Sequence, residues 1–222
     1  MFKTGNNFFG YFLIVATFLP LVPVILVFVR RIYGKEPLNS LMLICLLGFL
    51  EGFIGAAPSL NLENQSIVHD IFSLLLFGLF VRLFKTHLKG PLKYRLNIFL
   101  TAFLSSLITY GLIKGWGPGN FPLDALLNIV LTGILLLSLP SIVKAGHWLV
   151  FRSPLFWIAL GTLFYLLLFL LLEWAVPPCC RPLVASLNPD KMLLLSMADI
   201  IRYLIYTVAV LAYREEVVEE EG

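Results

Sequence analysis

Four side chains that can carry charge or hydrogen-bond share one helical face near the carboxyl end: Asp199, Arg202, Tyr203 and Tyr206. Their spacing puts them on the same side of a helix, and Ser196 extends that face by one turn. The flanking residues are apolar enough to cross a membrane, where a lone charge costs about 3 kcal/mol or more. The pattern predicts one of two arrangements. The residues form either a functional site that faces a bundle interior, or a purely structural ion pair in which Asp199 and Arg202 neutralise each other.

The composition is that of an integral membrane protein. Of the 222 residues 59% are apolar and only 13% charged, against roughly a quarter charged in soluble domains, and the mean hydropathy is +0.93. Continuous leucine runs such as residues 166–172 do not fit the alternating pattern of a membrane β-barrel. Helices are the other structure that can span a bilayer.

Seven apolar stretches have about the length that a hydrocarbon layer of ~30 Å requires. The first exceeds the core of a signal peptide and is expected to be a true helix. The expected fold is an all-α polytopic seven-helix bundle forming one domain, residues 1–214, with an acidic tail at 215–222. The stretches lie near residues 8–29, 41–57, 68–84, 96–113, 123–143, 155–176 and 192–213.

Alternate connections differ in Lys and Arg content, eleven against four. Positive residues favour the cytoplasmic side, so the amino terminus is expected outside and the carboxyl terminus in the cytoplasm. The expected location is the cytoplasmic (inner) membrane. The net charge of +3 reflects this topology and gives no indication of nucleic-acid binding, because the basic residues flank membrane segments.

With this topology, acidic residues gather in the outer half of the bundle. Asp70, Asp124 and Glu173 are expected to ring the outer mouth. Glu51 is expected ~15 Å from the inner end of its helix, and Asp199 ~10 Å from the outer end of the last one. The pattern predicts an outer-facing polar cavity.

Arg202 is the only cation expected within the spans, one turn below Asp199. The expected arrangement is an ionised Asp199 paired with Arg202 and a protonated Glu51. Two interpretations of the proton on Glu51 are open. It is either exchanged during signalling or transport, or it stays bound permanently in a carboxyl group that only packs.

Milder polar residues form stripes on three further helices, and each stripe is expected to face inward. Gly48 and Gly52 have the small-xxx-small spacing that lets another helix approach closely. The stripes are Asn97, Thr101 and Ser105; Asp124, Asn128 and Thr132; and Thr162, Tyr165, Phe169 and Glu173.

The sequence contains no zinc-protease, phosphate-loop or serine-hydrolase motif, and neither a metal nor a cofactor is expected. His69 and Asp70 could hold a proton or metal with Glu173, but a solvated interfacial pair is the favoured interpretation. Adjacent Cys179 and Cys180 are expected to stay reduced, pair with another chain or bind metal weakly.

Three short motifs resemble a group of small bacterial seven-helix membrane proteins. They are the segment from Arg152 to Ile158, Arg-Ser-Pro-Leu-Phe-Trp-Ile; Gly161-x-x-x-Tyr165; and Asp199-x-x-Arg202-Tyr203. The resemblance covers the chain loosely and implies a sensor-like or accessory role without an established ligand or activity. No residue role is transferred from it.

The favoured function is therefore a receptor-like or accessory membrane protein, not an enzyme. It would bind a small ligand, a lipid or a partner helix in the outer cavity and act through a separate membrane or cytoplasmic protein; a homo-oligomer is left open. The alternatives are a small proton-coupled transporter and an intramembrane enzyme modifying a lipid or isoprenoid. The candidate residues are Glu51, Asp70, Asp124, Glu173, Asp199, Arg202, Tyr203 and Tyr206.

Overall fold

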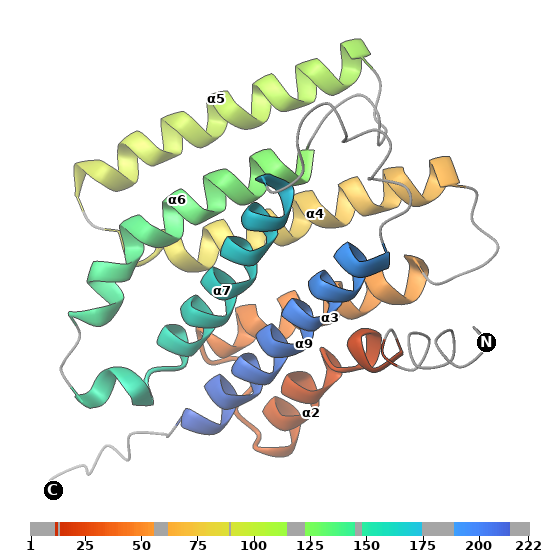
Figure 1. Ribbon diagram of the computed structural model, residues 1–222. Helices are drawn as coiled ribbons and strands as arrows, with labels where there is room; N and C mark the ends of the chain where they lie inside the picture. The colour runs from red at the N-terminus through yellow and green to blue at the C-terminus, as the bar shows by residue number, and fades with distance from the viewer. Residues whose placement is uncertain are drawn as a thin grey trace, which may run out of the picture.

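The computed structural model describes residue 12 and residues 14–55, 62–88, 90–114, 123–144, 148–174 and 189–213. These ranges form seven α-helices and one short 3-10 helix, with no strand among them (Figure 1). The elements are α2 (Leu21–Val29), α3 (Leu38–Gly55), α4 (Leu62–Lys85), α5 (Pro91–Lys114), α6 (Leu123–Val143), η1 (Trp148–Arg152), α7 (Pro154–Trp174) and α9 (Pro189–Ala212).

The predicted all-helical membrane fold is confirmed. Five helices are long and apolar enough to cross a membrane, and two shorter apolar helices, Ile14–Val29 and Leu38–Ile54, accompany them. The protein is thus of the multi-pass membrane type. Several helices begin before the predicted apolar stretch, because polar residues such as Lys93 and Arg95 continue the helix beyond its apolar part.

Prolines set the first position of α5, α7 and α9. Proline suits this position because its missing N–H would have no partner there and its φ angle is already helical. Pro20 has a different effect, since the first predicted stretch is interrupted by a turn at residues 19 and 20 before α2 begins. A proline ring within a helix clashes with the preceding turn and removes a backbone hydrogen bond, which explains this break.

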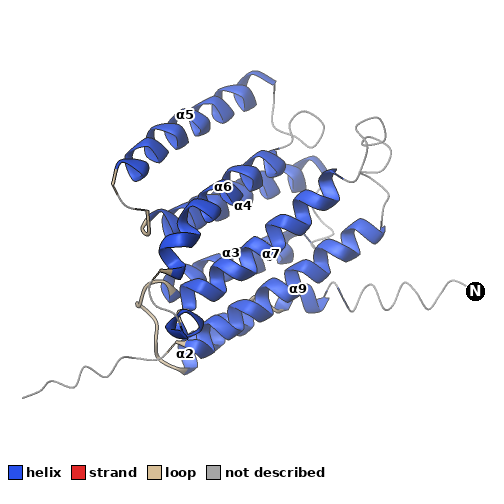
Figure 2. Cartoon of the chain, turned by 60° about the vertical axis from the view of Figure 1, so that its left-hand side comes forward, coloured by secondary structure: helices blue, strands red, loops and turns tan. Residues whose placement is uncertain are grey.

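The helices lie side by side in Figure 2, and the contacts between neighbours join six of them into a closed ring. Around it, α2 packs on α3, α3 on α4, α4 on α6, α6 on α7, α7 on α9, and α9 again on α2. The core of the ring is apolar and includes Phe84, Ile134, Ile158 and Leu166. Polar groups within the ring must therefore find partners among themselves.

Arg30, at the end of α2, connects the first helix of the ring to the last. Its guanidinium donates to the backbone carbonyl of Val210, to that of Leu211 at 3.3 Å and to that of Tyr213 at 2.9 Å. The last carbonyls of a helix have no partner within it and carry its negative end, so a cation is favourable there. The first and last helices of the ring are held together in this way.

Helix α7 lies close against α9 at Gly161. A Cβ atom there would lie 3.1 Å from Cε1 of Tyr206 and 3.2 Å from Cβ of Ile205. Gly48 of α3 faces α9 in the same way, because an added Cβ would overlap the hydroxyl of Tyr203. Both glycines therefore leave room for tyrosines of α9, and the expected close approach at Gly48 is found.

Helix α5 lies outside the ring, above α4 and α6 in Figure 1. It touches the ring through a few apolar side chains, such as Phe103, whose ring centroid is 6.4 Å from that of Phe77. Asn97, Thr101 and Ser105 are exposed, so the expectation that this stripe faces inward is wrong. The hydroxyl of Thr101 donates to the carbonyl of Asn97 in its own helix, which removes the need for an interior partner.

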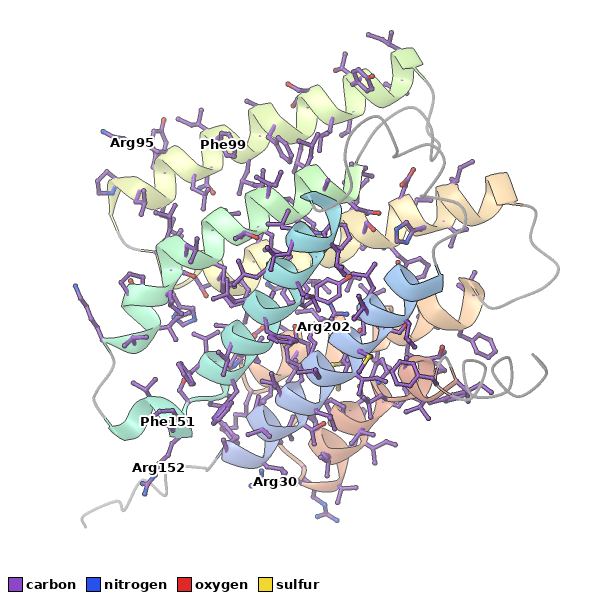
Figure 3. The ribbon with its side chains drawn as sticks, in the orientation of Figure 1. Arg30, Arg95, Phe99, Phe151, Arg152 and Arg202 are labelled. Carbon is purple, nitrogen blue, oxygen red and sulfur yellow. The ribbon has the colours of Figure 1, made fainter. Side chains whose placement is uncertain are left out.

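Most of the basic residues in the described ranges gather at one end of the bundle, although Lys114 and Lys191 belong to helix ends on the other side. Figure 3 places Arg30, Arg95 and Arg152 towards that end and Arg202 in the middle. The carboxyl end of α3 and the amino ends of α4 and α6, which carry Glu51, His69 and Asp124, lie at the opposite end. This separation of charge agrees with the alternation of basic connections in the sequence.

The α7–α9 contact gives a test of packing. Gly161→Val should lower the free energy of unfolding by about 1–3 kcal/mol, because the added atoms press on Tyr206 and Ile205. Gly133→Val is the matched control, since an added Cβ on that glycine of α6 meets nothing within 4 Å. Thermal unfolding in detergent measures both, and equal melting temperatures would contradict the assigned contact.

Candidate functional site

A cavity of about 570 Å³ lies inside the ring, lined from α3, α4, α6, α7 and α9 and from the helical turn that holds Ala16 and Thr17. Its walls are mixed. Phenylalanine and leucine side chains supply the apolar part, and two groups of charged residues supply the polar part. The charged lining residues are Glu51, His69, Asp124, Asp199 and Arg202.

The first charged group is centred on His69 of α4. Its Nδ1 lies 2.6 Å from Oε1 of Glu51 on α3, and its Nε2 lies 2.8 Å from Oδ2 of Asp124 on α6. Ser73, one turn along α4, also hydrogen-bonds Asp124. One imidazole thus connects three helices, and we refer to Glu51, His69 and Asp124 as the His69 cluster.

The two short contacts fix how many protons the His69 cluster holds. Each N···O contact needs one proton between its two electronegative atoms, because otherwise two lone pairs would face each other. The cluster therefore carries two protons. Either the imidazole holds both, as a cation between two carboxylates, or one is on the imidazole and one on a carboxyl group.

The second charged group is centred on Arg202 of α9. Its Nη2 lies 2.6 Å from Oδ1 of Asp199 and donates to the hydroxyl of Tyr203 at 2.9 Å. The guanidinium carbon lies 4.1 Å from the ring centroid of Tyr165 on α7 and 4.7 Å from that of Tyr203. Cation–π contacts of this kind gain strength where water is excluded, and the Arg202 side chain is only 13% exposed. We refer to Asp199, Arg202, Tyr165 and Tyr203 as the Arg202 cluster.

The Arg202 cluster retains unused hydrogen-bonding capacity. Nε of Arg202 is buried without a hydrogen-bond partner in the described structure, whereas the buried Oδ1 of Asp199 is paired with Nη2 of the same arginine. Buried polar atoms normally have partners, since an unsatisfied one costs about 1–3 kcal/mol. The Nε donor of Arg202, a residue of the cavity wall, is therefore available to a ligand.

Tyr206 lies beneath the cavity, not in its wall. Its side chain is fully buried, and its hydroxyl shares a hydrogen bond of 2.8 Å with that of Thr162 on α7. Thr162 also donates to the carbonyl of Ile158 in its own helix, so the tyrosine hydroxyl donates to Thr162. This contact fastens α9 to α7 directly below the Arg202 cluster.

The structure brings most of the predicted residues together. Glu51, Asp124, Asp199, Arg202 and Tyr203 all line the cavity. The polar stripes of α6 and α7 also face it through Asn128, Thr162, Tyr165 and Phe169.

Asp70 and Glu173 differ from the others in the predicted set. Asp70 is half-buried on α4 and does not line the cavity, so the expected ring of acids at the mouth includes Asp124 but not Asp70. Glu173 belongs to α7, but its side chain lies outside the described residues.

His69 is the functional candidate that sequence reasoning did not select. It was considered only with Asp70 and Glu173, whereas its ring nitrogens face Glu51 and Asp124. Its position one turn from Ser73, near the start of the apolar span Ile67–Lys85, could have identified it. Among the described residues, no group of three or more His, Cys, Asp or Glu is arranged to hold a metal ion.

The expectations for the adjacent cysteines and for the acidic tail concern residues that the structure does not describe. Cys179, Cys180 and the acidic tail at residues 215–222 lie outside the described residues. Cys45, which belongs to the apolar core of α3, is a buried free thiol.

The comparisons with known proteins give no relative. No protein-family model, curated protein or solved structure matches the chain. The site's geometry is accordingly the basis for assigning a function.

The geometry of the His69 cluster predicts that the stability of the fold depends on the His69 imidazole. His69→Leu should lower the free energy of unfolding by about 1–2 kcal/mol, because two carboxylates lose their shared partner in a half-buried site. Adding Glu51→Gln to His69→Leu should recover part of this loss, since it removes one of the two facing charges. Chemical or thermal unfolding of the full chain in detergent gives both values.

Asp70→Asn is the matched control for His69→Leu. Asp70 is the next residue on α4, and it makes no hydrogen bond or ion pair with the described residues. Its change should shift stability by less than the His69→Leu variant. Equal losses in the two variants would contradict a bridging role for His69.

Proposed function

We propose that the protein is a receptor-like or accessory membrane protein that binds a small molecule or lipid in the cavity of its helix ring. The observation that carries this proposal is the buried Nε of Arg202, which has no hydrogen-bond partner among the described residues and belongs to a residue that lines the central cavity. In the proposed orientation the amino terminus is outside, the protein lies in the cytoplasmic membrane and the cavity is in the outer half.

The size and lining of the cavity support a small ligand. Pockets that bind small molecules usually measure about 300–1,000 Å³ and combine apolar walls with a few placed polar groups. Here Phe77, Phe80 and Leu131 provide apolar wall, and the two charged clusters provide polar groups. A ligand with an apolar body and a polar end would match both parts.

Signal transmission in this proposal goes through a separate protein. The connection between α4 and α5 carries basic residues at the end of the bundle opposite the His69 cluster, and this end faces the cytoplasm in the proposed orientation. A ligand that contacted both clusters would draw together α3, α4 and α6 on one side and α7 and α9 on the other. Such a movement would change the spacing of the basic helix ends.

A pair of neighbouring variants tests ligand binding. Asn128 of α6 lines the cavity, whereas Ile129, the next residue, is exposed on the outside of the same helix. Native mass spectrometry of the purified full chain should detect a co-purified small molecule in the wild type and in Ile129→Phe. Asn128→Phe should lose it, because the phenyl ring occupies the ligand's space.

Two outcomes count against the binding proposal. A wild-type protein that carries no small molecule after gentle extraction would contradict it. Retention of the same molecule by Asn128→Phe at the wild-type level would move the binding site away from the cavity.

A proton-coupled transporter is the second candidate, favoured by the His69 cluster. Two short N···O contacts in series connect Glu51 to Asp124 along the cavity wall. Because hydrogen-bonded chains of this kind pass protons between their ends, the cluster could exchange protons with the cavity. The ion pair of Asp199 and Arg202 would then act as the gate.

Glu51→Gln distinguishes this second candidate. Proton flux into liposomes that hold a pH-sensitive dye should be abolished in Glu51→Gln, because glutamine cannot release a proton to His69. Asp70→Asn, which leaves the His69 cluster intact, should keep the wild-type flux. Unchanged flux in Glu51→Gln would remove Glu51 from any transport mechanism.

A further inference from the structure

A second recess, of about 400 Å³, lies at the basic end of the bundle. It is formed where α3 and α7 begin and where α4 ends. These points are the ends of two helices long and apolar enough to span a membrane, Ile67–Lys85 and Pro154–Leu172, and of the shorter apolar helix Leu38–Ile54. The recess is therefore at the level where the headgroups of a bilayer begin.

The polar groups of this recess have unused donors. The Arg82 guanidinium is 69% exposed, and its Nη2 lies 3.8 Å from Oε1 of Glu36, too far for a hydrogen bond. The ring of His87 and the hydroxyl of Ser153 make no hydrogen bond with any described residue. Three donors from two helix ends thus line one recess without a hydrogen-bond partner among the described residues, and Arg82 has only a long ion pair with Glu36.

Acceptors are few in the same recess. Glu36 is its only carboxylate among the described residues, and both oxygens of that carboxylate are within hydrogen-bond distance of the Ser40 hydroxyl. Burial lowers the pKa of His87, so its ring is mainly neutral at pH 7 and donates one N–H. A group rich in acceptors and negative in charge matches this set of donors.

The surrounding field also favours an anion. Helices α3 and α7 both begin at the recess, each with the partial positive charge of a helix amino end, whereas α4 alone ends there with a partial negative charge. Lys85 ends α4 beside it, and Arg152 precedes Ser153. Phosphate is the anion whose several oxygens suit an arginine fork together with hydroxyl and imidazole donors.

We propose that this recess binds a phosphate group, supplied by the headgroup of an anionic phospholipid, through Arg82, His87 and Ser153. Its place at the ends of two candidate membrane spans and one shorter apolar helix favours the lipid as the source over free phosphate. The exposed Phe151, in the short helix before Ser153, offers apolar surface near the recess for the acyl chain. This inference does not depend on the ligand of the central cavity.

Binding of short-chain lipids tests the proposal. The full-length protein in detergent is titrated with dihexanoyl phosphatidylglycerol, and affinity is measured by microscale thermophoresis. The double variant R82Q/H87Q should bind this probe about tenfold more weakly than the wild type, because charged hydrogen bonds to the phosphate are lost. Arg95→Gln, which removes an exposed charge of α5 outside the recess, should bind within about twofold of the wild type.

Two further probes separate the sources of phosphate. Dihexanoyl phosphatidylcholine, which has the same phosphate but no net charge, should bind more weakly than the glycerol lipid. Inorganic phosphate should bind more weakly still, because it gains nothing from apolar contact. If inorganic phosphate bound as tightly as the lipid and R82Q/H87Q abolished this binding, the lipid source would be overturned.

Other outcomes would overturn the site itself. An equal loss of affinity in R82Q/H87Q and Arg95→Gln would indicate diffuse attraction to the basic end. Ser153→Ala provides an independent test if the double variant does not fold, as judged by thermal unfolding without lipid. It should weaken binding about fivefold, and an unchanged affinity would exclude Ser153 from the site.

Discussion

The buried guanidinium of Arg202 sets the conditions for much of the ring. A charge removed from water must be matched by nearby groups, and here the match comes from Asp199 one turn away and from the rings of Tyr165 and Tyr203. The ring of Tyr203 fits because a neighbouring helix presents a small residue. Gly48 on α3 leaves space for Tyr203, so the position of α3 is tied to the requirements of the arginine.

The polar groups divide the ring into two parts. The His69 cluster connects α3, α4 and α6, whereas the Arg202 cluster connects α7 and α9. Each part satisfies its own charges, so neither depends on the other for a partner. The cavity lies where the two parts face each other, and apolar side chains fill the rest of the boundary. A ring built this way can alter the distance between its parts without exposing an unpaired charge.

Sequence reasoning succeeded where the determining forces are local. Apolar length located the helices, with α6 predicted at the bounds found, and helical spacing identified the pairing of Asp199 with Arg202. It did not find the contacts of His69, because the partners of that ring are fixed by how α3 and α6 pack on α4. It also misplaced the polar stripe of α5, since Thr101 and similar residues can bond to their own helix and so face either way.

The contact between Arg30 and the end of α9 has a consequence for the order of assembly. The two elements are about 180 residues apart in the chain, and α9 is made long after α2. Until α9 is inserted, the ring has a gap between α2 and α7, and the last carbonyls of α9 gain their cation only when it fills that gap. During synthesis the bundle must therefore remain an open arc, with the future cavity wall accessible from the side. Closure of the arc by its final helix would be the moment at which a lateral guest, such as a lipid, becomes enclosed.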